Sequence, residues 1–281
     1  MDGIIIINKP KGYTSHDVVN VLRKKLNIKK VGHTGTLDPN ATGVLPILVG
    51  QATKISKYLV EHDKEYIAEL KLGEKSTTGD IGGEIIEEKE VPNLTENKIK
   101  EILQAFLGRQ EQVPPIYSSI KINGKKAYEY AREGKQIEIP AREIDIMETE
   151  LIKLEENIIT FKVKCSKGTY IRVLCEDIAR KLGTVGLMNN LIRTRVDNFS
   201  IENSYTLEDL ENINLITIEE VFNEYPRIDL SSKKLELFLN GVKLSIDRED
   251  NLYRVYSSNN FIGLGIVKDN LLKRDIVVID N

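Results

Sequence analysis

The chain has 281 residues, of which 41% are hydrophobic and 30% charged, a balance typical of a globular protein with a substantial core. No apolar run approaches the length of a membrane span, so we expect no association with a membrane. Two cysteines, Cys165 and Cys175, cannot form a disulfide framework, and we expect both to be reduced packing residues in a cytoplasmic protein. The three histidines show no metal-ligand spacing, so we expect no metal site.

The net charge of −3 conceals a segregation of charge along the chain. Residues 1–60 carry nine Lys or Arg against three Asp or Glu, residues 162–195 carry eight against two, and residues 112–142 are also basic. The windows between and after them are acidic. A run of cations on a helix is usually a solvated face. Here the basic windows hold most of the polar motifs, which favours a polyanionic ligand.

The elements expected in the first part of the chain alternate irregularly between strands and helices. In chain order, the patterns predict a buried strand at 3–8, a helix capped by Ser15 or Asp17 and running to Leu26, a strand at 66–72, a helix at 95–107, a short helix at 126–132, a strand at 159–165 and a helix at 173–182. No regular βαβ period appears. We therefore expect an α+β fold with a mixed, largely antiparallel central sheet and flanking helices.

The end of the chain has a different pattern. Beyond a plausible boundary at residues 223–227, short strand-like runs at 252–256, 261–267 and 275–279 are separated by turns rich in Asn and Ser. This pattern predicts a small β-rich module. We accordingly divide the chain into a domain at 1–222 and a module at 227–281.

One polar segment stands out, GHTGTLDPNATGVLP at residues 32–46. Its three glycines permit backbone conformations closed to other residues, and Pro39 restricts the backbone of Asp38. We expect it to be too irregular for the interior of a helix or strand. A capped turn, in which Asp38 and Thr34 bond nearby backbone groups, is the ordinary explanation. The apolar run that follows directly is not expected of a surface turn, so we favour a loop that presents Asp38 to a ligand.

The longer stretch GHTGTLDPNATGVLPILVGQATK, residues 32–54, resembles the signature of the bacterial tRNA pseudouridine synthase family that modifies uridine 55, the TruB type. Three further stretches agree, in family order. They are GIIIINKPKGYTSHDVV at 3–19, Lys64-Glu65-Tyr66, and SKGTYIRVLCEDIARKLG at 166–183. The sequence FIGLGIV at 261–267 resembles a strand of PUA-type RNA-binding domains. The resemblance implies a pseudouridine synthase fold with a PUA-like module at 227–281.

The resemblance also implies roles for single residues. Asp38 corresponds to the catalytic aspartate, Arg172 to the arginine that pairs with it, and Tyr66 to the tyrosine that stacks on the target base. A neighbouring arginine favours the ionised carboxylate. Tyr170 alternates with Arg172 along an apparent strand, so that both could face one side. Further substrate-binding positions are carried over as His33, Tyr170, Lys9 and Leu191.

The implied reaction isomerises uridine 55 in the tRNA T-loop to pseudouridine. It breaks the C1′–N1 bond and joins C5 to C1′, which needs no redox change, phosphate transfer or metal. The target base must first leave the stack and enter a pocket. We expect no cofactor, no metal and no guide RNA, tRNA as the partner, and a monomer. The sequence leaves open whether Asp38 attacks C1′, attacks C6 or removes the C2′ proton.

The chain departs from the family pattern at peripheral positions. The usual Leu-Arg-Arg-x-x-Val-Gly becomes LIRTRVD at residues 191–197, Gly186-Leu187 stand where Ala-His is common, and Thr77 replaces a common aspartate.

Two alternative functions also stay open. One is an RNA-binding or RNA-folding protein whose catalysis is secondary, and the other is an N-glycosylase that releases free uracil.

Overall fold

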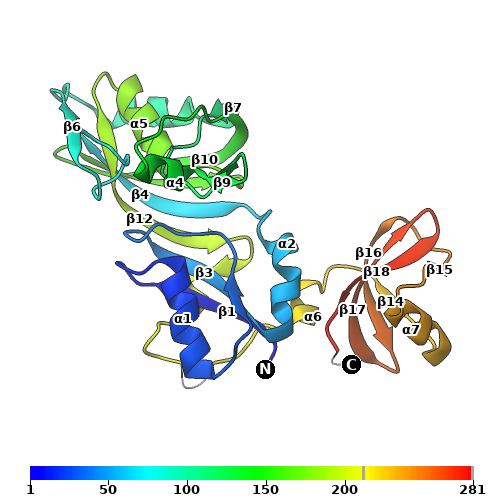
Figure 1. Cartoon of the computed structure of the whole chain (residues 1–281). Coiled ribbons are helices and arrows are strands. Elements are labelled where there is room, and N and C mark those ends of the chain that lie inside the picture. Colours follow the sequence, from blue (N-terminus) through cyan, green and yellow to red (C-terminus); the bar gives the residue numbers. More distant parts are fainter. Residues whose placement is uncertain (211–212, 280–281) are drawn as a thin grey trace.

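The computed structural model describes residues 1–210 and 213–279, which form two β-sheets with helices packed around them (Figure 1). In this described part, a nine-stranded sheet has the order β1-β3-β12-β4-β11-β10-β7, with β2 pairing with β3 and β13 with β12. Its strands are β1 (Gly3–Lys9), β2 (Val31–His33), β3 (Thr42–Val49), β4 (Lys64–Leu72), β7 (Gly108–Gln112), β10 (Arg142–Glu155), β11 (Ile158–Cys165), β12 (Gly186–Val196) and β13 (Phe199–Ser200). The pairing is antiparallel except between β3 and β12, which confirms the expected mixed, largely antiparallel sheet.

Helices cover this sheet, and two small hairpins extend from it. The helical segments are α1 (Ser15–Leu26), the 3₁₀ helix η1 (Gly50–Ile55), α2 (Ser56–Leu59), α3 (Glu96–Gln104), α4 (Ala127–Arg132), α5 (Ile171–Lys181), the 3₁₀ helix η2 (Ile201–Asn203) and α6 (Ile218–Val221). The hairpins pair β5 (Glu74–Ser76) with β6 (Ile85–Glu88), and β8 (Lys121–Ile122) with β9 (Lys125–Lys126). None of the helices in the described residues combines the length and apolarity needed to cross a membrane.

The C-terminal part forms a second, five-stranded sheet with the order β14-β16-β17-β18-β15. It contains β14 (Arg227–Asp229), α7 (Ser232–Leu239), β15 (Leu244–Ser245), β16 (Asn251–Ser257), β17 (Asn260–Lys268) and β18 (Leu271–Val277). The expected β-rich C-terminal part is confirmed, whereas helix α7 was not expected. Leu264 and Ile276 share a buried cluster with Ile4 and Val44 of the large sheet. The two sheets therefore have a common apolar contact.

Helix α1 begins at Ser15, one residue earlier than a Ser15 cap would allow and three residues earlier than an Asp17 cap would allow. The cap is Thr14, whose side-chain oxygen accepts a hydrogen bond from the Asp17 amide at 3.1 Å. The Asp17 carboxylate accepts in return from the Thr14 amide at 2.9 Å, which completes a capping box. The prediction of Ser15 or Asp17 as cap is therefore wrong, because Asp17 occupies the third helical position of the box and Ser15 the first.

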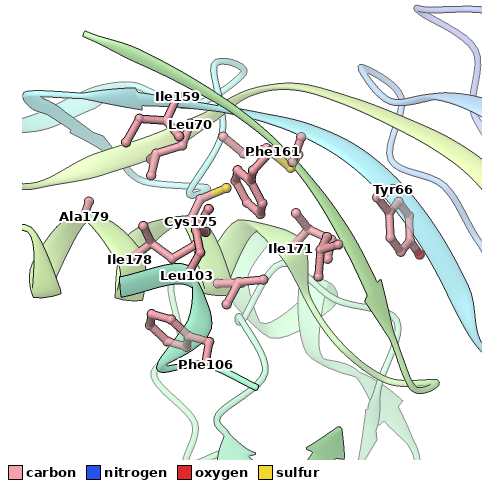
Figure 2. Packing of buried hydrophobic residues seen from close by; sticks show 14 of the residues in the cluster. Tyr66, Leu70, Leu103, Phe106, Ile159, Phe161, Ile171, Cys175, Ile178 and Ala179 are labelled. Carbon is pink, nitrogen blue, oxygen red and sulfur yellow. The ribbon is translucent and has the colours of Figure 1, made fainter. Parts of the chain in front are cut away.

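A large apolar core lies between helices α3 and α5 and strands β4, β10 and β11 (Figure 2). Phe161 and Ile159 of β11 face Cys175 and Ile178 of α5 across it. Cys165 and Cys175 are free and buried, as expected. Tyr66 belongs to the same cluster but lies at its edge (Figure 2), which places the ring where the core ends and a cavity begins.

The polar segment 32–46 is less irregular than expected. Its first residues belong to β2, its last residues belong to β3, and only residues 34–41 form a loop. Strand β3 pairs antiparallel with β1 from Gly43 to Val49 and parallel with β12 at Thr42 and Gly43. These two pairings supply hydrogen-bond partners for the backbone of the apolar run, and they fix the chain close to the end of the loop that carries Asp38. The loop that carries Asp38 is consequently short and held at both ends by strands.

Gly43 allows β3 to approach β12 closely. A Cβ atom at this position would lie 2.2 Å from the Arg193 carbonyl oxygen, and φ is +103°. We expect Gly43→Ala to lower the free energy of unfolding by about 3 kcal/mol or more, because backbone must move to relieve the clash. Gly108→Ala is the matched control, since φ there is +93° with no atom within 4 Å. Equal losses in urea unfolding of the two variants would contradict this account.

Candidate active site

A cavity of about 410 Å³ lies between the loop at residues 34–41 and the start of helix α5. The loop contributes Asp38, and α5 with the residue before it contributes Arg172 and Tyr170. Strands β4 and β12 form another wall. The side chains that matter below and line the cavity are Asp38, Lys64, Tyr66, Tyr117, Tyr128, Tyr170, Arg172, Leu191 and Arg193.

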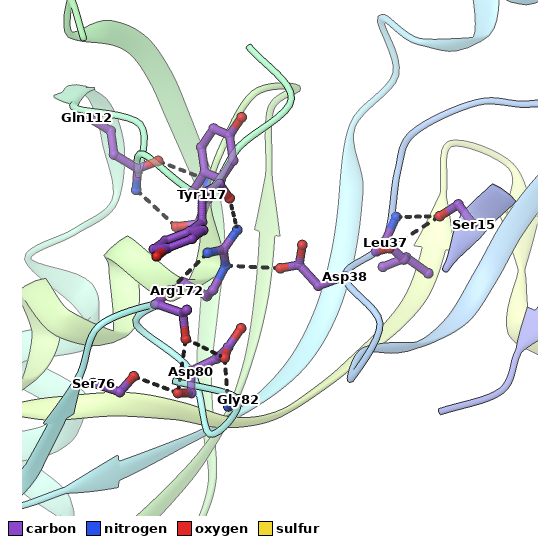
Figure 3. A network of polar contacts seen from close by, with 11 residues as sticks. Ser15, Leu37, Asp38, Ser76, Asp80, Gly82, Gln112, Tyr117 and Arg172 are labelled. Carbon is purple, nitrogen blue, oxygen red and sulfur yellow. Dashed lines mark hydrogen bonds and ion pairs between the residues drawn. The ribbon is translucent and has the colours of Figure 1, made fainter. Parts of the chain in front are cut away.

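Asp38 and Arg172 form an ion pair in this cavity, with 3.0 Å between the Asp38 Oδ2 and Arg172 Nε atoms (Figure 3). The remaining arms of the guanidinium donate to the Thr78 carbonyl and the Tyr117 carbonyl, each at 2.9 Å. Arg172 is therefore fixed by acceptors from three segments. The Asp38 side chain is still 36% exposed, whereas that of Arg172 is 6% exposed. The acid thus faces the cavity and the cation lies behind it.

Two opposing effects act on the pKa of Asp38. Burial raises its pKa above the ordinary value, and the negative charge of Asp80 acts in the same direction. The Arg172 guanidinium opposes this shift through its charge and its hydrogen bond. The expected stabilisation of the carboxylate by arginine is present, but burial outweighs it. The net direction is a raised pKa.

A polar turn at residues 77–83 supplies one of the acceptors that hold Arg172 (Figure 3). The Asp80 carboxylate accepts from the Thr78 hydroxyl and from the Gly82 amide, both at 2.8 Å. The Ser76 hydroxyl donates to the Asp80 carbonyl at 2.6 Å. These bonds fix the turn, so the Thr78 carbonyl is held where Arg172 reaches it.

Tyr170 and Arg172 do not alternate along a strand, so that prediction is wrong. Gly168, with φ at +81°, turns the chain out of β11, and Tyr170 is the N-cap residue of α5. The Gln112 side chain brackets the Tyr170 backbone, accepting from its amide at 2.8 Å and donating to its carbonyl at 3.2 Å. The first helical turn then carries Arg172. Both side chains still line the cavity, although the cause is a helix start rather than a pleat.

Tyr66 and Leu191 form the opposite wall. They lie on the paired strands β4 and β12, and their side chains are 7% and 6% exposed. Burial raises the pKa of Tyr66 to about 12, while the neighbouring Arg193 opposes the shift. The phenol is therefore neutral near pH 7. A buried aromatic ring near a partly exposed carboxylate in the same cavity is an arrangement that can hold a flat base next to an acid.

Comparison with known proteins now assigns the family. Residues 23–171 match the family described as TruB family pseudouridylate synthase (N terminal domain), and residues 172–232 match the tRNA pseudouridylate synthase B C-terminal domain. The chain belongs to the TruB family of pseudouridylate synthases. It is therefore an isomerase.

Similar proteins cover nearly the whole chain. The tRNA pseudouridine synthase B of Caldanaerobacter subterraneus subsp. tengcongensis is 45% identical over 273 residues, which cover 95% of this chain and 96% of that protein. The protein of the same name from Clostridium kluyveri is 46% identical over 280 residues, covering 96% of each. Among solved structures, an H/ACA RNP bound to a substrate RNA containing 2′-deoxyuridine matches 99% of this chain and 85% of that chain, with a TM-score of 0.72 at 23% identity. A Cbf5-Nop10-Gar1 complex gives a TM-score of 0.71 at 25% identity, covering 99% and 84%. The pseudouridine synthase fold is thereby confirmed.

Two residues carried over from the TruB resemblance lie outside the cavity lining. Lys9 is fully buried and donates to the carbonyls of Pro10, Tyr13 and Pro39 at 3.0, 2.6 and 3.2 Å. Burial lowers its pKa to about 8, with the charge of Asp38 opposing. All three ammonium protons are used. Lys9 therefore fixes the residue that follows Asp38 and contacts no open space.

We expect Lys9→Met to lower the free energy of unfolding by about 3 kcal/mol, because three partly buried carbonyl oxygens lose their donor at once. Lys11→Met, an exposed lysine in the same turn, is the control and should change little. Urea unfolding followed by circular dichroism measures both variants. Equal stability of the Lys9 variant and the unsubstituted protein would refute this role.

His33 lies on β2, and its Nδ1 atom is buried without a hydrogen-bond partner in the described part of the chain. Burial lowers its pKa, with the charge of Arg193 acting in the same direction, so the neutral imidazole is favoured. His33 is not among the described residues that line the cavity, and its role toward RNA stays a prediction. Within residues 1–210 and 213–279, no group of three His, Cys, Asp or Glu side chains lies close enough to hold a metal ion.

Several cavity residues were not singled out from the sequence. Tyr117 and Tyr128 come from the basic segment 112–142, which folds as β8, β9 and α4 beside the cavity. Lys126 and Arg132 lie over the Tyr128 ring, at 5.4 and 5.3 Å from its centroid. The sequence feature that could have indicated Tyr117 and Tyr128 was the positive charge of the segment around them. Cations interleaved with aromatic rings suit single-stranded nucleic acid.

Proposed function

We propose that this TruB-family isomerase converts uridine 55 in the T-loop of tRNA to pseudouridine, with Asp38 as the acting carboxylate. The observation that carries the proposal is the Asp38–Arg172 ion pair in a cavity walled by Tyr66 and Tyr170. The relatives named tRNA pseudouridine synthase B support tRNA as the substrate. The RNA path would run over the basic segment 112–142.

The reaction needs an acid, an aromatic surface and an enclosed space. The C1′–N1 bond breaks, the uracil turns while it is held in the cavity, and a new bond joins C5 to C1′. The proton on C5 leaves, and N1 gains one, so the product is an isomer. The Asp38 carboxylate is placed to bond C1′, to bond C6 or to remove the C2′ proton. The neutral Tyr66 ring is placed to stack on the base, which must have left its helix.

We further propose that the protein acts without a cofactor or guide RNA. The H/ACA RNP and the Cbf5-Nop10-Gar1 complex share its fold. The cavity of this chain already combines acid, cation and aromatic walls without a partner. We also propose residues 227–281 as a PUA-like RNA-binding module. The expected monomeric state and cytoplasmic location remain predictions.

The decisive assay uses purified protein and a tRNA transcript that carries tritium at C5 of its uridines. Formation of the C5–C1′ bond releases this tritium to water. We expect release of one tritium per transcript with no other protein, RNA or metal added. A transcript with cytidine at position 55 is the matched control and should release none. Absence of release from the first transcript at excess enzyme would overturn the proposal.

A second candidate function, RNA binding or folding with secondary catalysis, is favoured by the cations and rings of segment 112–142. Complementation of a strain that lacks the gene distinguishes binding from catalysis as the main role. If Asp38→Asn restores every phenotype of the deletion, binding is the main role. Failure of that variant to restore them assigns the main role to catalysis.

A further inference from the structure

Arg193 is a buried arginine that the sequence did not single out. It is 1% exposed and heads the largest fully buried side chains of the described residues. It lies on β12 where three strands meet, registered against Gly43 of β3 on one side and Tyr66 of β4 on the other. Its side chain also lines the cavity. The position connects the strand that carries Tyr66 with the loop that carries Asp38.

The guanidinium joins the start of the loop at residues 34–41 to strand β3, which follows the loop. Its Nε atom donates to the Val44 carbonyl at 2.7 Å, and its Nη2 atom donates to the Gly35 carbonyl at 2.8 Å. A Cβ atom at position 35 would lie 3.4 Å from Nη1, where φ is +68°. Gly35 therefore lets the loop backbone lie directly against the guanidinium. One planar group thus connects the start of the loop with the strand that follows it.

Tyr66 lies beside Arg193 as its partner across the β4–β12 ladder, both residues line the cavity, and the Arg193 guanidinium opposes the rise in the Tyr66 pKa. In the described part of the chain, Arg193 forms no ion pair with an aspartate or glutamate. Its buried charge is held by neutral oxygens alone, which is a costly arrangement. A hydrocarbon side chain would fill the same space without that cost. The presence of an arginine at this position therefore indicates a role for its charge and its planar fork of donors.

We propose that Arg193 is a positioning residue of the isomerase, which fixes the distance between the Tyr66 ring and the Asp38 carboxylate while the uracil turns. The planar fork of donors suits this task, since its Nε and Nη2 arms each have one backbone acceptor in a set direction. The inference rests on the proposed roles of Asp38 and Tyr66. A small displacement between the acid and the stacked base reduces the rate strongly, because reaction requires close, aligned atoms.

The test is a double-mutant cycle of Arg193→Lys and Tyr66→Phe. Lysine keeps the buried cation but loses the fork. We expect Arg193→Lys alone to lower the single-turnover rate about 100-fold while the Kd for tRNA changes less than about threefold. In the Tyr66→Phe background the further loss should shrink to about tenfold or less, because the hydroxyl that couples the two residues is gone. Arg195→Lys, an exposed arginine on the same strand, is the control.

Two results would overturn the inference while the unsubstituted protein still releases tritium. One is an Arg193→Lys variant with an unchanged rate. The other is a double variant whose rate falls by the product of the losses in the two single variants, which would show that the two residues are not coupled. If Arg193→Lys does not fold by circular dichroism, Arg193→Gln replaces it. Failure of both to fold would assign Arg193 to the fold alone. Failure of the proposed function is distinct, since it removes tritium release from the unsubstituted protein.

Discussion

Asp38→Asn is expected to lower tritium release from C5-labelled tRNA by about 10⁴-fold or more, because none of the other described residues that line the cavity carries a carboxylate. The change removes one charge and keeps the shape. The Kd for tRNA should therefore change less than about threefold, since phosphate contacts supply most of the affinity. Single-turnover release and filter binding on the same preparation measure the two effects.

Asp209→Asn is the matched control for this variant. Asp209 is exposed and lies outside the cavity lining, so the same change of charge should leave the rate unaltered. An Asp38→Asn variant that retains a measurable fraction of the rate would refute the assignment of the acting carboxylate. Equal loss of binding and rate would instead assign Asp38 to holding the RNA.

Arg172→Met should produce the second large effect, a loss of about 100- to 1,000-fold in the rate at neutral pH. The variant removes the cation 3.0 Å from Asp38 and the donors to the Thr78 and Tyr117 carbonyls. Because Arg172 opposes the rise in the Asp38 pKa, its removal should raise that pKa further. The carboxylate then takes a proton at higher pH. The acid limb of the pH–rate profile should move toward higher pH, so part of the rate returns as the pH is raised.

Arg172→Lys separates charge from geometry. The lysine keeps a cation near Asp38 but lacks the planar fork whose separate nitrogens contact Asp38 and the Thr78 and Tyr117 carbonyls. We expect its acid limb to stay close to that of the unsubstituted protein while its maximal rate falls. Arg180→Met, an arginine of the same helix paired with Asp177 rather than Asp38, is the control. An acid limb of the Arg172→Met variant at the original pH would contradict the account.

The sequence predicted those elements whose side chains alternate or repeat cleanly. Strands β4 and β11 and helix α5 have such patterns, and the structure places them within two residues of expectation. Strand β12 was missed, although it is central in the sheet. Its apolar run is interrupted by Asn189, Asn190 and the buried Arg193, so it shows neither alternation nor a continuous apolar stretch.

The site was predicted from family motifs rather than from periodicity. The motifs named Asp38, Tyr66, Tyr170, Arg172 and Leu191, and the structure brings these five to one cavity. The sequence did not reveal Arg193, because a lone arginine gives no sign that it is buried. Its partners are mainly backbone carbonyls of distant segments. Such contacts arise only when the chain folds.

Mapping of pseudouridine at nucleotide resolution, in an unmodified tRNA transcript treated with the purified protein alone, tests the central claim most directly. We predict pseudouridine at position 55, one per transcript, with no free uracil in the products. The Asp38→Asn protein should leave the transcript unmodified. Pseudouridine at another position would contradict the assigned target, and free uracil with an abasic site would show an N-glycosylase instead.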